Sequence, residues 1–143
     1  MVDVRGRWAL ITGASRGIGR LAALFMAERG CNLILQGRSL EHSEKVLQEV
    51  RAKGVEAYAV AAELSDLDAV AGMLKEIDEK TPVVDIVLNN AGLQIAYRVE
   101  YFETPVSDYM ESYKINTVAP AMICYHFLPK MIQNGFLCKP VLV

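Results

Sequence analysis

Three glycines near the start of the chain form a segment that can bind a diphosphate. Gly13, Gly17 and Gly19 lie within residues 12–19 (Thr-Gly-Ala-Ser-Arg-Gly-Ile-Gly), between a short apolar run and an amphipathic stretch. Glycines permit a tight turn whose backbone approaches a ligand closely. A helix that begins at such a turn presents free N–H groups and the positive end of its dipole to an anion. The segment therefore predicts a dinucleotide site, and the alternative is an ordinary strand-to-helix turn.

The residues after the second apolar run indicate which nicotinamide cofactor would bind. Proteins that prefer NAD usually place a carboxylate here, where it binds the ribose hydroxyls. This chain reads Gln-Gly-Arg-Ser at 36–39 and has no acid before Glu41. Arginines and hydroxyls suit a phosphate dianion instead, although each arginine alone can be a solvated loop charge. We therefore expect NADP(H), with its extra phosphate bound by Arg16, Arg38, Ser15 and Ser39.

Apolar runs and helical patterns alternate along the chain, which predicts an α/β fold. Strands are expected over residues 8–12, 32–36, 55–60 and 83–88, and residues 140–143 look like the start of a fifth. Helices are expected between them, with Gly30 closing the first, Ser65 capping the third and a long one over about 107–133. This alternation specifies a parallel sheet with right-handed crossovers and helices on both faces.

The composition describes one globular domain and excludes several classes of partner. The chain has 143 residues, of which 52% are hydrophobic, and a net charge of −2, which argues against nucleic acid. No signal peptide and no apolar run of about 20 residues is present, so we expect a cytoplasmic protein without a membrane partner. Three cysteines without a CxxC pair and two histidines without nearby ligands predict no disulfide and no metal site.

Three motifs together resemble the short-chain dehydrogenase/reductase family. They are the glycine segment at 12–19, the run Asn-Asn-Ala-Gly at 89–92 after the fourth apolar run, and Asn116 within residues 114–120. Their order and spacing are similar to the family from about residue 5 to the end of the chain. The resemblance implies a Rossmann-type doubly wound parallel sheet of strand order 3-2-1-4 with the start of strand 5. Residues 1–143 would form part of an NADP(H)-binding domain.

The resemblance also assigns residues to the cofactor. Glu63 and Leu64 stand where the family usually has an Asp and an apolar residue near the adenine, and the longer Glu63 side chain departs from that pattern. The Asn-Asn-Ala-Gly run can alternatively be an ordinary strand-to-loop turn. The remaining positions are Gly13, Gly17, Ile18 and Gly19 at the phosphates, and Asn90, Ala91 and Gly92 at the adenosine ribose, where they would also brace the sheet.

The resemblance implies that Asn116 is the one catalytic position of the family that the chain contains. Pro120 stands four residues later and has no N–H, so the Asn116 carbonyl would lose its helical donor and could bind a water. A lone Asn in an apolar helix is more often satisfied by nearby backbone. The resemblance implies that the matching Asn positions a water in a proton relay that ends at a lysine and a tyrosine.

The chain contains no Tyr followed four residues later by Lys, the pair that carries proton transfer in this family. We therefore expect it to end before the catalytic Ser, Tyr and Lys of a longer NADP(H)-dependent enzyme. That enzyme would reduce a carbonyl or oxidise an alcohol, as 3-oxoacyl-carrier-protein reductases do. The alternatives are a catalytically inactive nucleotide-binding module and a redox-sensing regulator. The resemblance also implies a homodimer or homotetramer, because the family's long helix commonly forms a subunit interface.

Overall fold

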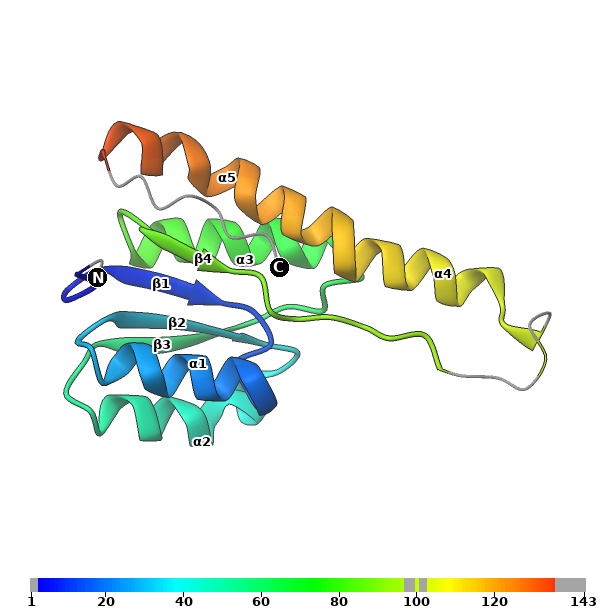
Figure 1. Cartoon of the computed structure of the whole chain (residues 1–143). Coiled ribbons are helices and arrows are strands. Elements are labelled where there is room, and N and C mark those ends of the chain that lie inside the picture. Colours follow the sequence, from blue (N-terminus) through cyan, green and yellow to red (C-terminus); the bar gives the residue numbers. More distant parts are fainter. Residues whose placement is uncertain (1–2, 97–99, 101–102, 136–143) are drawn as a thin grey trace.

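Four parallel strands form the sheet at the centre of the protein (Figure 1). The computed structural model describes residues 3–96, 100 and 103–135. Within these residues the strands are β1 (Trp8–Ile11), β2 (Asn32–Gly37), β3 (Ala57–Ala61) and β4 (Ile86–Leu88). Their order is β3-β2-β1-β4. The parallel pairing and this order confirm the predicted Rossmann-type arrangement.

Helices cover both faces of the sheet (Figure 1). On one face lie α1 (Gly17–Ala27) and α2 (Leu40–Arg51), and on the other lie α3 (Leu67–Lys80) and α5 (Ala119–Gln133). Between β4 and α5 the chain forms α4 (Val106–Tyr113), which extends beyond the sheet, and a π-helical turn, η2 (Lys114–Val118). No helix in the described part of the chain is long and apolar enough to cross a lipid bilayer.

The two faces of the sheet bury separate apolar clusters. Leu10 and Ile34 pack with Phe127 of α5, whereas Leu33 and Leu35 pack with Val46 of α2. Neighbouring residues of one strand point to opposite faces, so each strand contributes to both clusters. Strands covered on both sides need near-continuous apolar runs, and this is why the apolar runs predicted the strands well.

Several predicted boundaries differ from the structure. β3 begins at Ala57 and β4 at Ile86, later than the apolar runs indicate. The N-cap of α3 is Asp66 and not Ser65, because the Asp66 carboxylate accepts the N–H groups of residues 68 and 69 at 3.0 and 3.1 Å. The C-cap of α1 is Glu28, and Gly30, with φ +78°, follows in the closing turn. Residues 140–143, the expected fifth strand, lie outside the described residues.

The long helix expected over 107–133 is interrupted before Pro120. At the interruption, the Ala119 N–H donates to the carbonyl of Lys114, five residues earlier. A proline cannot donate to the carbonyl four residues before it, so the regular hydrogen-bond ladder cannot continue through Asn116. The wider π turn accommodates this loss, and α4 and α5 still run in one general direction (Figure 1).

Candidate nucleotide-binding site

Gly13 and Gly19 allow the glycine turn to pack closely against the segment after β4. Gly13 has φ +62°, and a Cβ there would lie 3.0 Å from the Ala91 Cα. A Cβ on Gly19 would lie 2.3 Å from the Gly13 oxygen and 2.5 Å from Asn90 Nδ2. Gly17, with φ +56°, has open space where its Cβ would point. The turn therefore packs closely against neighbouring backbone at Gly13 and Gly19, and it leaves open space at Gly17.

Thr12 connects the glycine turn to the segment after β4. Its Oγ1 accepts the N–H groups of Asn90 and Ala91, both at 3.0 Å. Asn90 Nδ2 donates in return to the carbonyls of Thr12 at 3.0 Å and Gly13 at 3.3 Å. These bonds hold the two segments together, while a contact of Asn90 with the ribose stays a prediction. This role of Thr12 is not predicted from the sequence, where its only signal is a hydroxyl at the end of a buried strand.

Gln36 fixes the glycine turn to the end of β2. Its side chain is buried, and its Oε1 accepts the Gly13 N–H at 3.0 Å, while its backbone oxygen accepts the Ala14 N–H at 3.0 Å. Nε2 donates to the carbonyls of Gly37 and Ala62, at 3.1 and 2.8 Å. A single amide thus joins the turn, β2 and the segment after β3. The sequence indicates Gln36 as the last residue of a strand and as part of a run without an acid, but it does not predict these hydrogen bonds.

The N-terminus of α1 has no side-chain cap. Arg16 is the N-cap residue and accepts no capping bond, and the first turn contains no acid. In contrast, Ser39 caps α2 and Asp66 caps α3. The first N–H groups of a helix need an acceptor, and a bound phosphate can provide it. Of these three helices, α1 therefore has the end best suited to an anion.

Arg16 and Arg38 differ from the other arginines of the described residues. The chain has eight arginines, of which Arg98 lies outside those residues. Arg16 and Arg38 form no ion pair or side-chain hydrogen bond within the described part of the chain. Five others bond to protein acceptors: Arg5 to Asp3, Arg7 to Asp85, Arg20 to Glu49, Arg29 to the Phe25 carbonyl and Arg51 to the Ala57 carbonyl. Because Gln36 holds the glycine turn to the end of β2, Arg16 and Arg38 belong to the same edge of the sheet.

Gly37, at the end of β2, packs closely against a side chain of α2, which would have to shift if position 37 carried a side chain. A Cβ on Gly37 would lie 2.6 Å from the Oγ of Ser43, which is buried on α2. Ser39 follows as the N-cap of α2, and its Oγ accepts the His42 N–H at 3.4 Å and lies 3.0 Å from His42 Nδ1. The predicted phosphate ligand Ser39 therefore already has a protein partner. The sequence does not predict this contact, because the spacing of His42 bears only on metal binding.

The other predicted cofactor residues occupy mixed environments. Ile18 is 76% exposed at the start of α1, and Ser15 is half-buried before it. Glu63 is exposed, and its carboxylate accepts the Ser65 N–H at 3.4 Å. Leu64 is 5% exposed and belongs to the apolar core. Glu63 follows β3, whose last residue pairs with Gly37, so it lies near the end of β2; its contact with the adenine stays a prediction.

The Asn116 side chain binds backbone, as lone polar residues in helices usually do. Nδ2 donates to the Leu93 carbonyl and Oδ1 accepts the Leu93 N–H, both at 2.8 Å. Nδ2 also donates to Ser112 Oγ at 3.0 Å. A Cβ on Gly92 would lie 3.4 Å from Asn116 Oδ1, so this amide also lies beside Gly92. Asn116 thus positions the segment after β4, and the role of its carbonyl stays a prediction.

Two further titratable groups lie away from this edge. Asp78 of α3 accepts from His126 Nε2 and Lys130 Nζ of α5, both at 2.9 Å. Partial burial would raise the pKa of Asp78, but the hydrogen bond from Lys130 and the charge of His126 lower it overall. Burial and the nearby Asp85 raise the pKa of Cys31 to about 12, so this thiol is unreactive at neutral pH. Among the residues that the structure describes, no three acidic, His or Cys side chains gather as metal ligands.

The chain matches one protein family over most of its length. The family described as short chain dehydrogenase matches residues 7–136. An uncharacterized oxidoreductase of Mycobacterium tuberculosis is 35% identical over 136 residues, which make up 93% of this chain and 40% of that protein.

Two solved structures share the fold. A 3-oxoacyl (acyl-carrier-protein) reductase from Agrobacterium tumefaciens with NADP bound is 31% identical with a TM-score of 0.83, and the match covers 92% of this chain and 50% of that one. NAD+-bound xylitol dehydrogenase is 29% identical with a TM-score of 0.84, covering 94% and 52%. The chain thus spans only about half of the length of each of these relatives, or less. The same fold holds either cofactor, so side chains must select between them.

Proposed function

Because the chain belongs to the short chain dehydrogenase family, we propose that it is the nucleotide-binding part of an oxidoreductase that uses NADP(H). The nicotinamide, when bound, supplies or accepts the hydride. The reaction is then the reduction of a carbonyl or the oxidation of the matching alcohol. The chain's own residues bind and orient the nucleotide, and they contribute one position, Asn116, to proton transfer.

The observation that carries the choice of NADP(H) is the contrast among the arginines. Arg16 and Arg38 have no protein acceptor within the described residues, and both belong to the edge where the uncapped α1 begins. A guanidinium offers planar, charged donors that match a phosphate. The end of β2 further supports this choice, because residues 36–39 contain no carboxylate that would favour NAD.

The proposed site divides the nucleotide among three segments. The glycine turn and the first N–H groups of α1 bind the pyrophosphate, with Ile18 beside it. Arg16, Arg38, Ser15 and Ser39 bind the 2′-phosphate. Glu63 and Leu64 border the adenine, and Asn90, Ala91 and Gly92 border the ribose. Asn116 holds the Leu93 backbone in place through its amide, and we propose that its carbonyl binds the relay water.

Substitution of Arg38 tests the cofactor. We expect Arg38→Asp to weaken NADPH binding by about 100-fold, because a charged donor is replaced by a repelling carboxylate. NADH binding should change by less than about threefold, since NADH has no phosphate at this position. Calorimetric titration of both nucleotides measures the two effects. Arg29→Gln, at the other end of α1, is the matched control and should change neither; equal losses for both nucleotides would contradict the proposal.

The proposed substrate class is a 3-oxoacyl thioester, as in the related reductase from Agrobacterium tumefaciens. The chain lacks a Tyr and Lys four residues apart, so we expect it to bind NADPH without turnover unless such a pair is supplied. Turnover is measured as the loss of NADPH absorbance when a 3-oxoacyl thioester is added to a protein that contains both this chain and such a pair. NADPH binding by that protein without turnover on any carbonyl would favour the inactive module or redox-sensing regulator instead.

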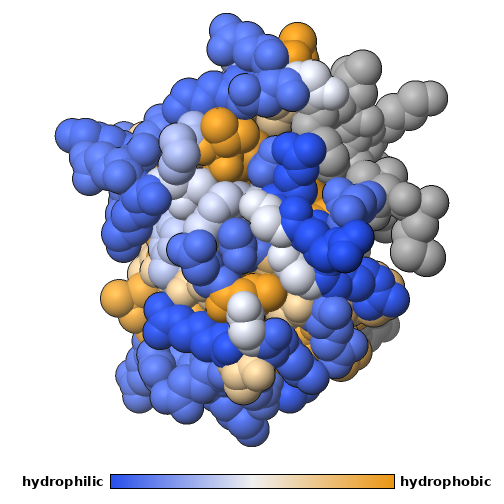
Figure 2. Space-filling model, turned by 90° about the vertical axis from the view of Figure 1, so that its left-hand side faces the viewer, coloured by the Kyte–Doolittle hydropathy of each residue, from blue (hydrophilic) through white to orange (hydrophobic). Residues whose placement is uncertain are grey.

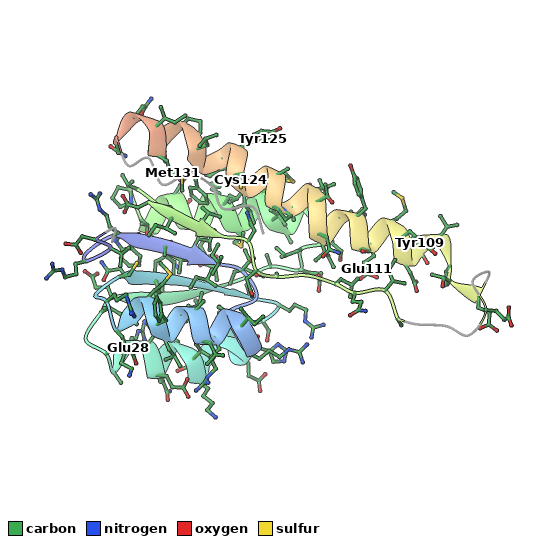
Figure 3. All side chains as sticks on the ribbon, viewed as in Figure 1. Glu28, Tyr109, Glu111, Cys124, Tyr125 and Met131 are labelled. Atoms are coloured by element: carbon green, nitrogen blue, oxygen red, sulfur yellow. The ribbon has the colours of Figure 1, made fainter. Side chains whose placement is uncertain are left out.

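We also propose that α4 and α5 pair with a second copy of the chain. Both helices carry exposed large apolar residues, namely Tyr109, Met110, Tyr113, Tyr125, Leu128 and Ile132. In Figure 3, Tyr125 points away from the sheet, whereas Cys124, which accepts from Asn89 Nδ2, faces it. Such a row of exposed apolar side chains marks an interaction surface. Sedimentation equilibrium should show a dimer or tetramer that Tyr125→Lys shifts toward the monomer.

A further inference from the structure

We propose that His42 positions the Ser39 hydroxyl for the 2′-phosphate and makes NADP(H) affinity depend on pH. This inference rests on the proposed function, since it concerns the same phosphate subsite. His42 is an exposed residue in the first turn of α2, and its Nδ1 lies 3.0 Å from Ser39 Oγ. Ser39 directly follows Arg38, so the paired hydroxyl and imidazole stand beside the arginine that selects the phosphate.

The direction of the Ser39–His42 hydrogen bond decides whether the hydroxyl can serve a ligand. Ser39 Oγ has one proton to donate and already accepts the His42 N–H at 3.4 Å. When the neutral imidazole carries its proton on Nε2, Nδ1 can only accept, so the hydroxyl proton stays within the protein. When the imidazole is protonated, Nδ1–H can only donate, so Ser39 Oγ accepts again and its own proton is free for a phosphate oxygen.

Protonation of His42 therefore helps phosphate binding in two ways. It releases the Ser39 proton, and it adds a positive charge next to Arg38. By linkage, a bound 2′-phosphate favours the protonated imidazole, and NADPH binding takes up a proton that NADH binding does not.

Charged side chains on the elements around α2 form no ion pair with the His42 imidazole within the described residues. His42 forms no ion pair within the described residues, and its side-chain partner there is Ser39. Arg20 of α1 is paired with Glu49 of α2, so that charge is already neutralised. Glu44 of α2 accepts from Gln48, and Arg51 donates to the Ala57 carbonyl. Other charged side chains on α2 and the neighbouring segments include Arg16, Arg38, Glu41, Lys45 and Glu63.

Calorimetry from about pH 6 to about pH 8 tests the proposal on the purified protein. NADPH and NADH are titrated in buffers of different ionisation enthalpy, which gives both affinity and proton uptake. The variants are His42→Gln, Ser39→Ala and, as the matched control, His126→Gln, which removes the chain's only other histidine. The 2′-phosphate of NADPH also titrates, and this contribution cancels when the unaltered protein is compared with His42→Gln. Thermal unfolding checks that each variant is folded.

When the pH falls from about 8 to about 6, NADPH affinity should rise in the unaltered protein. We expect this rise to be about fivefold larger than the rise in His42→Gln. Ser39→Ala should lose the part of this excess that comes from the hydroxyl and keep the part that comes from the imidazolium charge, and His126→Gln should keep all of it. A pH dependence unchanged by His42→Gln overturns the proposal, and an excess in Ser39→Ala as large as in the unaltered protein overturns the role of the hydroxyl. If NADPH binds no better than NADH at any pH, the proposed function fails instead, so the two failures are distinguishable.

Discussion

Arginines differ in their partners between the edge of the sheet where the strands begin and the edge where they end. At the edge where the strands begin, Arg7 pairs with Asp85 at 3.1 Å and Arg5 pairs with Asp3 at 3.1 Å. Figure 2 shows this side of the molecule, where hydrophilic residues predominate. At the edge where the strands end, Arg16 and Arg38 have no protein acceptor among the described residues. The same side chain is a structural partner at one edge and an available donor at the other.

The acids of the chain explain the difference between the edges. Asp85 is buried, and besides Arg7 it accepts the Trp8 N–H at 3.0 Å, so its carboxylate belongs to the fold. No acid occupies residues 12–19 or 36–39. A charge satisfied inside the protein contributes to stability, whereas an unsatisfied one keeps its donors for a ligand. Substitution of the arginines or their acids at the first edge should therefore affect unfolding, and substitution of the arginines at the second should affect binding.

The largest effect on unfolding free energy should come from a side chain at Gly19, at the edge where the strands end. Gly19→Ala places a Cβ against backbone of the glycine turn, so we expect a loss of about 3 kcal/mol or more in unfolding free energy. Gly30→Ala at the opposite edge is the control. There φ is +78° and the Cβ would meet Arg5 Cγ, a flexible side chain, so the cost should be about 1–2 kcal/mol. Urea unfolding measures both; equal losses would contradict the tight packing at Gly19.

A smaller effect should separate the arginines at the two edges. Asp85→Ala removes the acceptor of the Trp8 N–H and one acceptor of Arg7, so we expect a loss of about 2–3 kcal/mol in unfolding free energy. Arg16→Gln and Arg38→Gln break no bond within the described residues and should stay within about 0.5 kcal/mol. The same urea experiment applies. A comparable loss in Arg38→Gln would show that this arginine is structural and would remove the contrast.

The smallest effect concerns Asp78, whose charge is satisfied between α3 and α5. Its pKa is lowered below 3.8, so its contribution to stability is present above that value and is lost as the pH falls through the lower pKa of the folded state. We expect Asp78→Asn to cost about 1 kcal/mol or less near pH 6, because the pair is partly exposed. Unfolding at several pH values should show the difference from the unaltered protein disappearing below about pH 4. A constant difference at all pH values would exclude the charge as its cause.

Much of the fold was predictable from the chain because its local signals agree with one another. The apolar runs at β1 and β2 and the glycines between β1 and α1 indicated a parallel sheet with a nucleotide turn. The errors occurred where partners distant in sequence or competing caps decide the outcome. Asp66 rather than Ser65 caps α3, and the helix around Asn116 widens into a π turn before Pro120.

The sequence by itself determined the glycine turn, the absence of an acid at the end of β2 and the presence of Arg16 and Arg38, because these depend on residue types at fixed spacing. Only the tertiary structure decided which polar groups are already satisfied. Gln36 holds the glycine turn, Thr12 holds the segment after β4, and Ser39 is paired with His42. Hydrogen bonds between segments far apart in sequence depend on how the strands pair and pack, and residue spacing along the chain does not specify them.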